Sequence, residues 1–474
     1  MHPFGMPEQV RQFTSFPSKG YFPPLAPTLP LLALFIMKPE KKPTRWQKVR
    51  KFFTDIHLWL GLTSGLIVVA ICFSGTVYVF YSEIKEDSLP ELYKTVAPEN
   101  AVPLSIEELI AKTETSTGGK VTSLKTFADP ERTWQLTVTM PILQPFDKLR
   151  AQDEKVPGQT QGKNDKEEPR PINYRVDPYT GEIKGDLTNA KNGTTEFMST
   201  MFSLHRWLLL DKIEKPIFGE LPNRKLGSYI SGTATILFTL GCITGLIIWF
   251  PNKVKNWKQG LKIKLDGNWK RINHDLHNSL AFYALIFLIL MGLTGPQWSF
   301  QWYRTGMQKT LGTYKPEDAP KPEQPKSILL LDSLAKPATI SQYHTAAQQA
   351  LPGAGDFTIN LPADSVATVS ISKVHVGFFA SSASDKLQLD QYTAEVLKVE
   401  VFKDKPFNER VAGSIKAVHV GDVYGKFTKI LYFIACLIAT TLPVTGTIIW
   451  INKLKKKRAK TLKKLKSVIP VAAA

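Results

Sequence analysis

Four stretches of the sequence are almost purely apolar and about 20 residues or more long, the length that a helix needs to cross about 30 Å of hydrocarbon. A buried helix of a globular protein is rarely so long and so free of charge, so each stretch predicts a transmembrane helix. The four stretches cover residues 57–83, 226–250, 274–298 and 427–450. The expected fold class is a mainly α membrane protein with four transmembrane helices.

The positive charge of the chain lies beside the ends of these helices. Residues 38–51, 251–273 and 452–474 hold 23 of the 60 Lys and Arg residues but only 2 of the 41 Asp and Glu residues. The positive-inside rule places these three segments in the cytoplasm. We therefore predict a multi-pass membrane protein with both termini in the cytoplasm, which in a bacterium is a protein of the cytoplasmic (inner) membrane. Lys clusters next to helix ends favour topology over nucleic-acid binding as their explanation.

This topology divides the chain into alternating membrane and aqueous segments. The two long segments, 84–225 and 299–426, are expected on the periplasmic side. Residues 1–37 are expected to be a disordered extension, with Met37 at the start of the functional protein. The other segments are the first basic segment with its helix (38–83), the helices 226–250, 274–298 and 427–450, the basic loop 251–273 and the basic tail 451–474.

Residues of the same type recur at matching places in the two halves of the chain. An offset of 220 separates His57 from His277, and an offset of 214 separates His205 from His419. The segment VDPYTGEI matches LDQYTAEV at an offset of 213, and TGLIIWF matches TGTIIWI at an offset of 201. Matches in one order predict a tandem two-helix repeat with about 13 extra residues at 211–223. Parallel repeats are commonly related by an axis along the membrane normal, so equivalent residues lie at one depth.

Two pairs of equivalent histidines therefore become candidate metal ligands. His57 and His277, here called the inner pair, begin the outward helices at the cytoplasmic edge. His205 and His419, the outer pair, precede the inward helices. Two imidazoles that face each other at one depth match the axial ligands of a bis-histidine haem, so two haem b groups are predicted. Four histidines split between opposite membrane edges cannot build one tetrahedral zinc site, and copper at the outer pair is the less favoured alternative.

Three further residues are candidates for cofactor binding. Gly75 and Gly295 each follow an inner histidine by 18 residues, which is about 27 Å of helix, so both are expected near the outer pair. A glycine there either lets a flat macrocycle approach the backbone or lets two helices pack closely. His274 lies three residues before His277 on the same helix face, and its equivalent in the first half is Thr54. His274 is the inner ligand, a partner of that ligand or a propionate contact, and the repeat favours His277 as the ligand.

The two long outer segments share an order of predicted elements. The predicted helices are 103–113 and 339–353, and the predicted strands are 133–140, 172–178, 366–374 and 386–391. The first helix begins with a capping box of Ser105 and Glu108. Each half is thus expected to carry a small α+β domain, with residues 146–171 as a mobile loop and with His344 and His375 in structural roles. No Ser-His-Asp, Cys-His or paired-carboxylate set stands out, so no catalytic residue is assigned.

Several motifs resemble the PepSY-associated transmembrane helix family. They are RWQKVRKFFTDIHLWLGLTSGL, SLHRW, VHVGDVYGKF and the repeated T-G-x-x-[IV]-W ends, while DPYTGEI and DQYTAEV look like the ends of PepSY domains. The resemblance covers most of residues 38–455. Members of this family include iron-regulated inner-membrane proteins and ferric-siderophore reductases, which are four-helix haem proteins that reduce iron in the periplasm. The resemblance implies PepSY-like outer domains and haem ligation at His57, His277, His205 and His419.

The predicted function is that of an inner-membrane di-haem b electron-transfer protein that reduces a ferric siderophore or another ferric chelate. Its electron donor is a quinol or a cytoplasmic reductase, because no P-loop or G-x-G-x-x-G unit is found for a bound nucleotide cofactor. Membrane lipid is an expected partner and nucleic acid is not. The alternatives are a haem-free PepSY-type regulator and a siderophore or iron transporter, which the lack of broken helices disfavours.

Overall fold

The computed structural model describes residues 44–97, 99, 102–140, 171–251, 254–320, 323–328 and 336–468. The predicted extension 1–37 and residues 146–170 of the predicted mobile loop lie outside this set.

Four long apolar helices are present at the predicted places. They are α1 (Arg45–Tyr78), α7 (Asn223–Trp249), α8 (Trp269–Thr294, continued by the 3-10 helix η5, Gly295–Trp298) and α12 (Gly425–Val468). Each is long and apolar enough to cross a membrane. The helices α1 and α12 extend into the basic segments, because Lys and Arg are good helix formers in water.

The first helix is shorter at its far end than the sequence predicts. It ends at Tyr78 rather than at residue 83, and a separate helix α2 (Tyr81–Ser88) follows. The Tyr78 and Tyr81 rings stack across this break with centroids 4.8 Å apart. A stacked aromatic pair stabilises the change in direction.

The spanning helices pack through small residues. A Cβ on Gly292 of α8 would lie 2.2 Å from Thr239 Oγ1 of α7, so only glycine allows this approach. Buried residues of α8 and α12 form a shared core, which consists of Ala284, Leu288, Ala435, Ala439 and Leu442. Small residues at a helix interface are the usual way in which membrane helices come into van der Waals contact.

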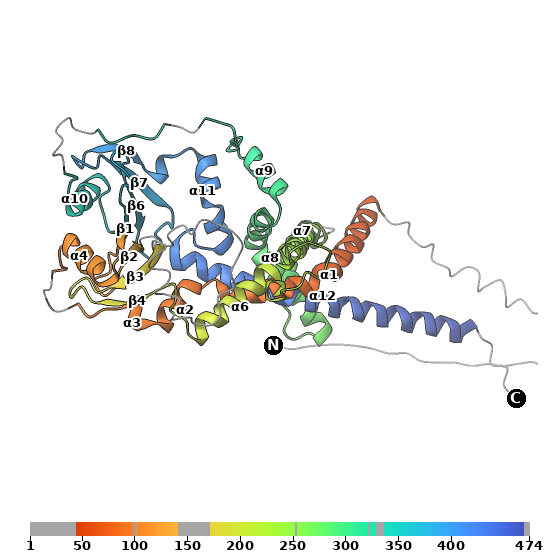
Figure 1. Ribbon diagram of the computed structural model, residues 1–474. Coiled ribbons are helices and arrows are strands. Elements are labelled where there is room, and N and C mark those ends of the chain that lie inside the picture. Colours follow the sequence, from red (N-terminus) through yellow and green to blue (C-terminus); the bar gives the residue numbers. More distant parts are fainter. Residues whose placement is uncertain are drawn as a thin grey trace, which may run out of the picture. The chain divides into compact units, whose positions relative to one another are not determined.

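The outer segments form one antiparallel sheet of eight strands. The strands are β1 (Lys120–Thr126), β2 (Trp134–Thr139), β3 (Pro171–Val176), β4 (Ile183–Asp186), β5 (Gly355–Asn360), β6 (Val369–His375), β7 (Ser384–Leu389) and β8 (Val396–Glu400). Their order is β4-β3-β2-β1-β5-β6-β7-β8 (Figure 1). The strands of the two halves thus share one sheet, because β1 and β5 pair in the middle, with Leu124 opposite Ile359. This pairing satisfies backbone groups that would otherwise form an exposed edge in each half.

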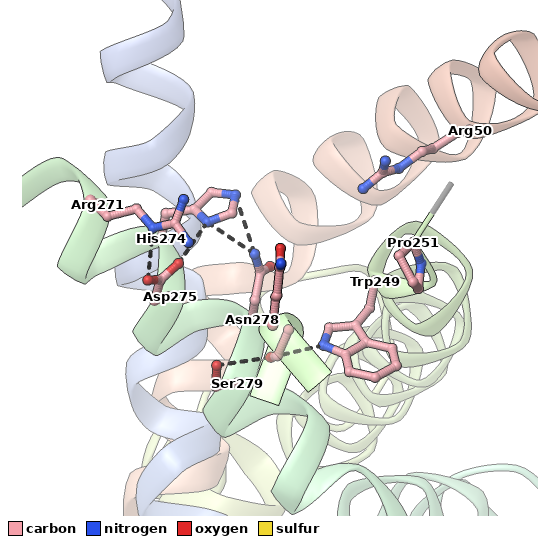
Figure 2. Close-up of a pocket in the computed structure, with 10 residues that line it drawn as sticks. Arg50, Trp249, Pro251, Arg271, His274, Asp275, Asn278 and Ser279 are labelled. Atoms are coloured by element: carbon pink, nitrogen blue, oxygen red, sulfur yellow. Dashed lines mark hydrogen bonds and ion pairs between the residues drawn. The ribbon is translucent and has the colours of Figure 1, made fainter. Parts of the chain in front are cut away.

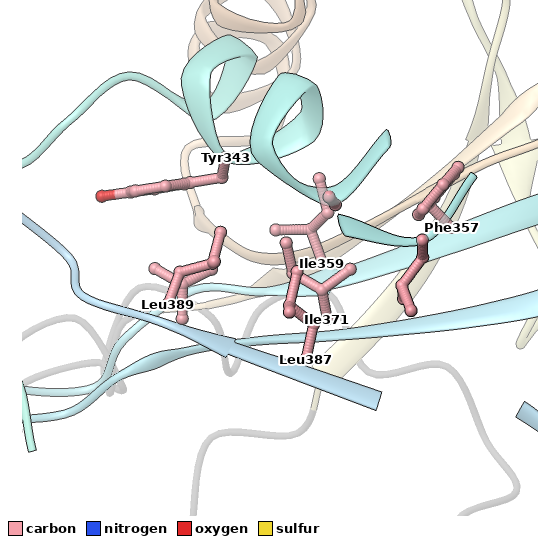
Figure 3. Close-up of a cluster of buried hydrophobic side chains, with 9 residues drawn as sticks. Tyr343, Phe357, Ile359, Ile371, Leu387 and Leu389 are labelled. Atoms are coloured by element: carbon pink, nitrogen blue, oxygen red, sulfur yellow. The ribbon is translucent and has the colours of Figure 1, made fainter. Parts of the chain in front are cut away.

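Each half of the sheet has its own hydrophobic core under one helix. The helices α4 (Ile106–Thr117) and α10 (Ile340–Ala350) lie on the same face of the sheet (Figure 1). Figure 3 shows the core under α10, where Tyr343 and Phe357 pack around aliphatic side chains of β5, β6 and β7. Ile340 also packs against the core under α4. The two cores are thus adjacent on one continuous sheet.

Local signals of the sequence are found in these elements. Ser105 Oγ accepts the backbone N–H of Glu108 at 3.2 Å and caps α4. The Asp177 carboxylate accepts the N–H groups of the two residues after Pro178, and Asp390 accepts those of the equivalent residues in the second half. His375 Nε2 lies 2.8 Å from Asp385 Oδ2 at the end of β6. In the DPYTGE and DQYTAE motifs, the aspartate side chain therefore stabilises the turn that follows it.

Further helices connect the sheet to the spanning helices. They are α3 (Pro90–Tyr93), α6 (Gly193–Trp207), η3 (Leu210–Lys212), α9 (Gln301–Thr310), η6 (Phe402–Asp404) and α11 (Phe407–Val420). The 3-10 helix η4 (Val254–Leu261) instead lies in the basic loop between α7 and α8. The sequence did not indicate α6 and α11 as helices, yet each follows the last strand of its half and precedes a spanning helix. The extra residues 211–223 lie between α6 and α7, where Asn223 hydrogen-bonds three backbone groups of the loop. The tandem repeat as such stays a prediction.

Candidate functional site

The inner pair comes together between α1 and α8. The rings of His57 and His277 have centroids 6.3 Å apart and planes at 80° to each other. His57 Nδ1 lies 3.0 Å from the carbonyl oxygen of Gly241 and 3.2 Å from Thr244 Oγ1, both on α7. His277 Nδ1 lies 2.9 Å from Thr445 Oγ1 on α12. All four spanning helices therefore contribute to this pair.

The outer pair comes together between α6 and α11. The rings of His205 and His419 have centroids 6.2 Å apart and planes at 64° to each other. His205 Nδ1 lies 2.9 Å from the Ile71 carbonyl oxygen of α1, and His419 Nδ1 lies 3.0 Å from Thr294 Oγ1 of α8. Burial lowers the pKa of His205 and brings that of His419 to about 3. Both imidazoles are thus neutral at pH 7.

The hydrogen bonds fix which ring nitrogen carries the proton. A carbonyl oxygen only accepts, so His57 and His205 donate from Nδ1. The threonine hydroxyls also accept from Nδ1, because each hydroxyl uses its own hydrogen for a backbone carbonyl. Thr445 Oγ1 donates to the Thr441 carbonyl at 3.0 Å, and Thr294 Oγ1 donates to the Leu290 carbonyl at 2.7 Å. Their lone pairs are left for the histidines. In all four rings Nε2 then keeps a free lone pair, as in metal-binding histidines whose other nitrogen is held by a hydrogen bond.

A glycine faces each of the four imidazoles. A Cβ on Gly75 would lie 3.2 Å from Cε1 of His205, and one on Gly295 would lie 3.3 Å from Cε1 of His419. For the inner pair, a Cβ on Gly245 or Gly446 would lie 3.2 Å from Cε1 of His57 or His277, respectively. Gly75 and Gly295 thus lie at the outer pair, where each makes room for an imidazole ring. The four glycines let the rings lie directly on a neighbouring helix.

The ring separations suit one metal ion between the members of each pair. Two imidazoles bound through Nε2 on opposite sides of a metal have centroids about 6 Å apart. This distance is the sum of two metal–nitrogen bonds of about 2.0 Å and the distance of about 1 Å from each nitrogen to its ring centroid. The separations of 6.3 and 6.2 Å agree with this value. Among the described residues, no group of three or more His, Cys, Asp or Glu side chains is placed to hold a metal ion. The two imidazoles of each pair are the protein ligands that would hold one haem iron, with the remaining ligands supplied by the macrocycle.

A cavity of about 410 Å³ surrounds the inner pair. Its walls are mostly apolar and include Leu58, Val68, Phe238, Leu285 and Leu442 from the four spanning helices. Its charged and polar lining residues include Arg50, Asp55, His274 and Lys453. This volume lies in the usual range for cofactor sites, and its lining combines an apolar body with a few polar groups.

His274 and His344 are not members of the two pairs, although His274 lines the cavity of the inner pair. His274 does not face His57; its side chain is half exposed and contacts Asn278 Nδ2 at 3.1 Å. The His344 ring packs against Phe357 in the sheet domain, with centroids 5.3 Å apart. The structure therefore brings His277, and not His274, opposite His57.

Sequence reasoning missed the threonines and two of the glycines at the site. Thr244 and Gly245, and likewise Thr445 and Gly446, are the T-G dipeptides of the repeated T-G-x-x-[IV]-W ends. Their recurrence marked them as equivalent but did not indicate a role. A Ser-Gly and a Thr-Gly dipeptide also end at Gly75 and Gly295, so a search for hydroxyl-glycine pairs at matching depths would have found all four.

The comparison with protein families identifies the family of the chain. The family model described as the PepSY-associated TM region matches residues 54–453. The chain therefore belongs to this family and is a multi-pass membrane protein. A search among curated proteins gives no match.

Proposed function

We propose that the protein is a di-haem b electron-transfer protein of the bacterial inner membrane, which reduces ferric iron, most simply in a ferric siderophore, on the side of the sheet domain. The observation that carries the proposal is the pair of imidazole couples with ring centroids 6.3 and 6.2 Å apart. In this proposal the two halves are a tandem repeat, the sheet is formed by two PepSY-like units in the periplasm, and both termini are cytoplasmic.

The residues of the chain have three tasks in this function. The four histidines hold the two irons through Nε2, and the carbonyls and threonines that accept from Nδ1 fix the orientation of each ring. The apolar walls exclude water from the inner site and lower its dielectric, which tunes the potential. Bound haem supplies one-electron chemistry, which side chains alone do not.

The distance between the two pairs supports transfer across the membrane. His57 and Gly75 are 18 residues apart on α1, and His205 lies against Gly75. At about 1.5 Å per residue the two levels are about 27 Å apart, close to the thickness of the hydrocarbon layer. A redox group at each level would therefore exchange electrons at opposite edges of the insulating layer. The acceptor is then a ferric ion that takes one electron from the outer level, and the donor at the inner level is a quinol or a cytoplasmic reductase.

Haem content and spectra test the proposal. Protein purified from haem-replete cells is expected to contain two haem b per chain, with Soret and α bands that sharpen on reduction with dithionite. His57→Ala or His277→Ala should remove one haem, and His205→Ala or His419→Ala the other. His344→Ala is the matched control, because this histidine packs in the sheet domain.

A colourless preparation from such cells, or four single variants that all keep two haems, contradicts the proposal. Reduction of ferric chelates by the dithionite-reduced protein then tests the acceptor separately. A protein that holds two haems but reduces none of the chelates retains the electron-transfer function and excludes the ferric acceptor.

A further inference from the structure

A polar pocket of about 430 Å³ adjoins the apolar cavity of the inner pair. Arg50, Trp249, Gly260, His274 and Asn278 line both spaces, which are therefore adjacent. Figure 2 shows Arg50 on α1 on one side of the pocket and His274 and Asn278 on α8 on the other. A ligand that fills both spaces has an apolar body and a polar edge.

The polar pocket has more positive than negative charge available to a ligand. Its carboxylate, Asp275, is 4 % exposed and already accepts Arg271 Nε at 2.8 Å and the backbone N–H of Lys264 at 3.3 Å. Arg50 has no carboxylate within ion-pair distance in the part of the chain that the structure describes. A guanidinium without a partner beside an apolar cavity favours an anionic group on the ligand.

The donors of the pocket suit carboxylates in particular. Arginine presents a planar fork of N–H groups that matches a carboxylate. His274 and Asn278 contact each other across the opposite wall, with Asn278 Nδ2 at 3.1 and 3.2 Å from the two ring nitrogens. Between the two spaces, Trp249 stacks on Phe282 with ring centroids 4.1 Å apart, so the wall beside the donors is flat and apolar.

We propose that Arg50, His274 and Asn278 bind the propionate carboxylates of the inner haem. This inference rests on the proposed function. The carboxylate edge of the macrocycle then faces the polar pocket, and the rest of it lies between His57 and His277. His274 is a positioning residue in this arrangement and not an axial ligand. Because the first half has Thr54 at the equivalent place, only one half supplies such an imidazole, and the macrocycle has one preferred orientation.

The test compares natural haem with haem whose two carboxylates are methyl esters. The full chain with His419→Ala, which leaves only the inner haem, is loaded with protohaem or with protohaem dimethyl ester. Release to excess apomyoglobin measures retention, and a redox titration gives the midpoint potential. The variants are Arg50→Gln and His274→Gln, and the matched control is Lys51→Gln, an exposed neighbour on α1 that lines neither space.

With protohaem, each of the two variants is expected to release haem about tenfold faster than the parent, because a charge-assisted hydrogen bond is lost. Arg50→Gln should also lower the midpoint potential, since a nearby cation favours the reduced iron. With the dimethyl ester, parent and variants should release at the same rate. Equal acceleration with both haems, or no acceleration with protohaem, overturns the inference while leaving the proposed function intact. A parent that binds no haem overturns both.

Discussion

Replacing Thr445 by valine removes the hydroxyl that accepts from His277 Nδ1 and leaves the shape of the side chain almost unchanged. The hydrogen bond is 2.9 Å long, and the donor that loses it lies inside the bundle. An unsatisfied buried donor costs about 1–3 kcal/mol, and the loss of a group that orients a metal ligand typically lowers metal affinity about 10–100-fold. We therefore expect Thr445→Val to release the inner haem about tenfold faster or more than the parent protein.

The other two threonines provide graded controls. After Thr244→Val, His57 keeps the Gly241 carbonyl at 3.0 Å, and after Thr294→Val, His419 keeps the Met291 carbonyl at 3.2 Å. His277 keeps an interaction with the Leu442 backbone after Thr445→Val, but that contact lacks the geometry of a hydrogen bond, so both changes should cost less than Thr445→Val. Haem transfer to apomyoglobin, followed by absorbance in the Soret band, measures all three. Equal losses in the three variants, or full retention in Thr445→Val, would refute the assignment of Nδ1 as the donor.

Three predictions concern stability. Lys373 is fully buried and donates to three backbone carbonyls at 2.6–2.8 Å, so Lys373→Met should lower stability by about 2–3 kcal/mol in urea unfolding; an unchanged midpoint would contradict this. Gly227→Ala should abolish folded protein in size-exclusion profiles, because its Cβ would lie 2.1 Å from the Trp207 carbonyl oxygen, whereas Gly61→Ala, with nothing within 4 Å, should behave as the parent. Two lysines lower the pKa of Glu400 to about 2. The difference in unfolding free energy between the parent and Glu400→Gln should be full above about pH 4.5 and vanish towards pH 2. A free-energy difference that persists at pH 2 would refute this prediction.

The membrane helices were predictable because their signal is local and strong. Twenty apolar residues in a row leave a chain few options, and α7 begins and ends within three residues of the predicted limits. The ends of α1 and α12 were less predictable, because the hydropathy signal stops where the basic segments begin but helix formation does not. The strands β4 and β8 were missed because they are brief and do not alternate. The strands β1 and β5 were missed because each has only two large apolar residues, which do not stand out from the polar residues around them.

The candidate site was predictable only as far as the repeat reaches. The similar offsets of 220 and 214 residues matched His57 with His277 and His205 with His419, and the repeat favoured His277 over His274. They did not indicate that Thr445 holds an imidazole, because that contact joins residues 168 positions apart. The sequence pattern also treated the outer segments as independent units, since backbone pairing of β1 with β5 leaves no mark in side-chain periodicity.

The seam between β1 and β5 makes the two halves of the chain structurally dependent on each other. A half cut away from its partner would expose a row of unpaired backbone groups, which can form hydrogen bonds with another strand. Because Leu124 and Ile359 meet at this seam, the most favourable partner for either fragment is the other one. The halves are thus complementary pieces rather than self-sufficient modules, and two separately made fragments, divided in the loop after α7, have the means to find each other and rebuild the whole.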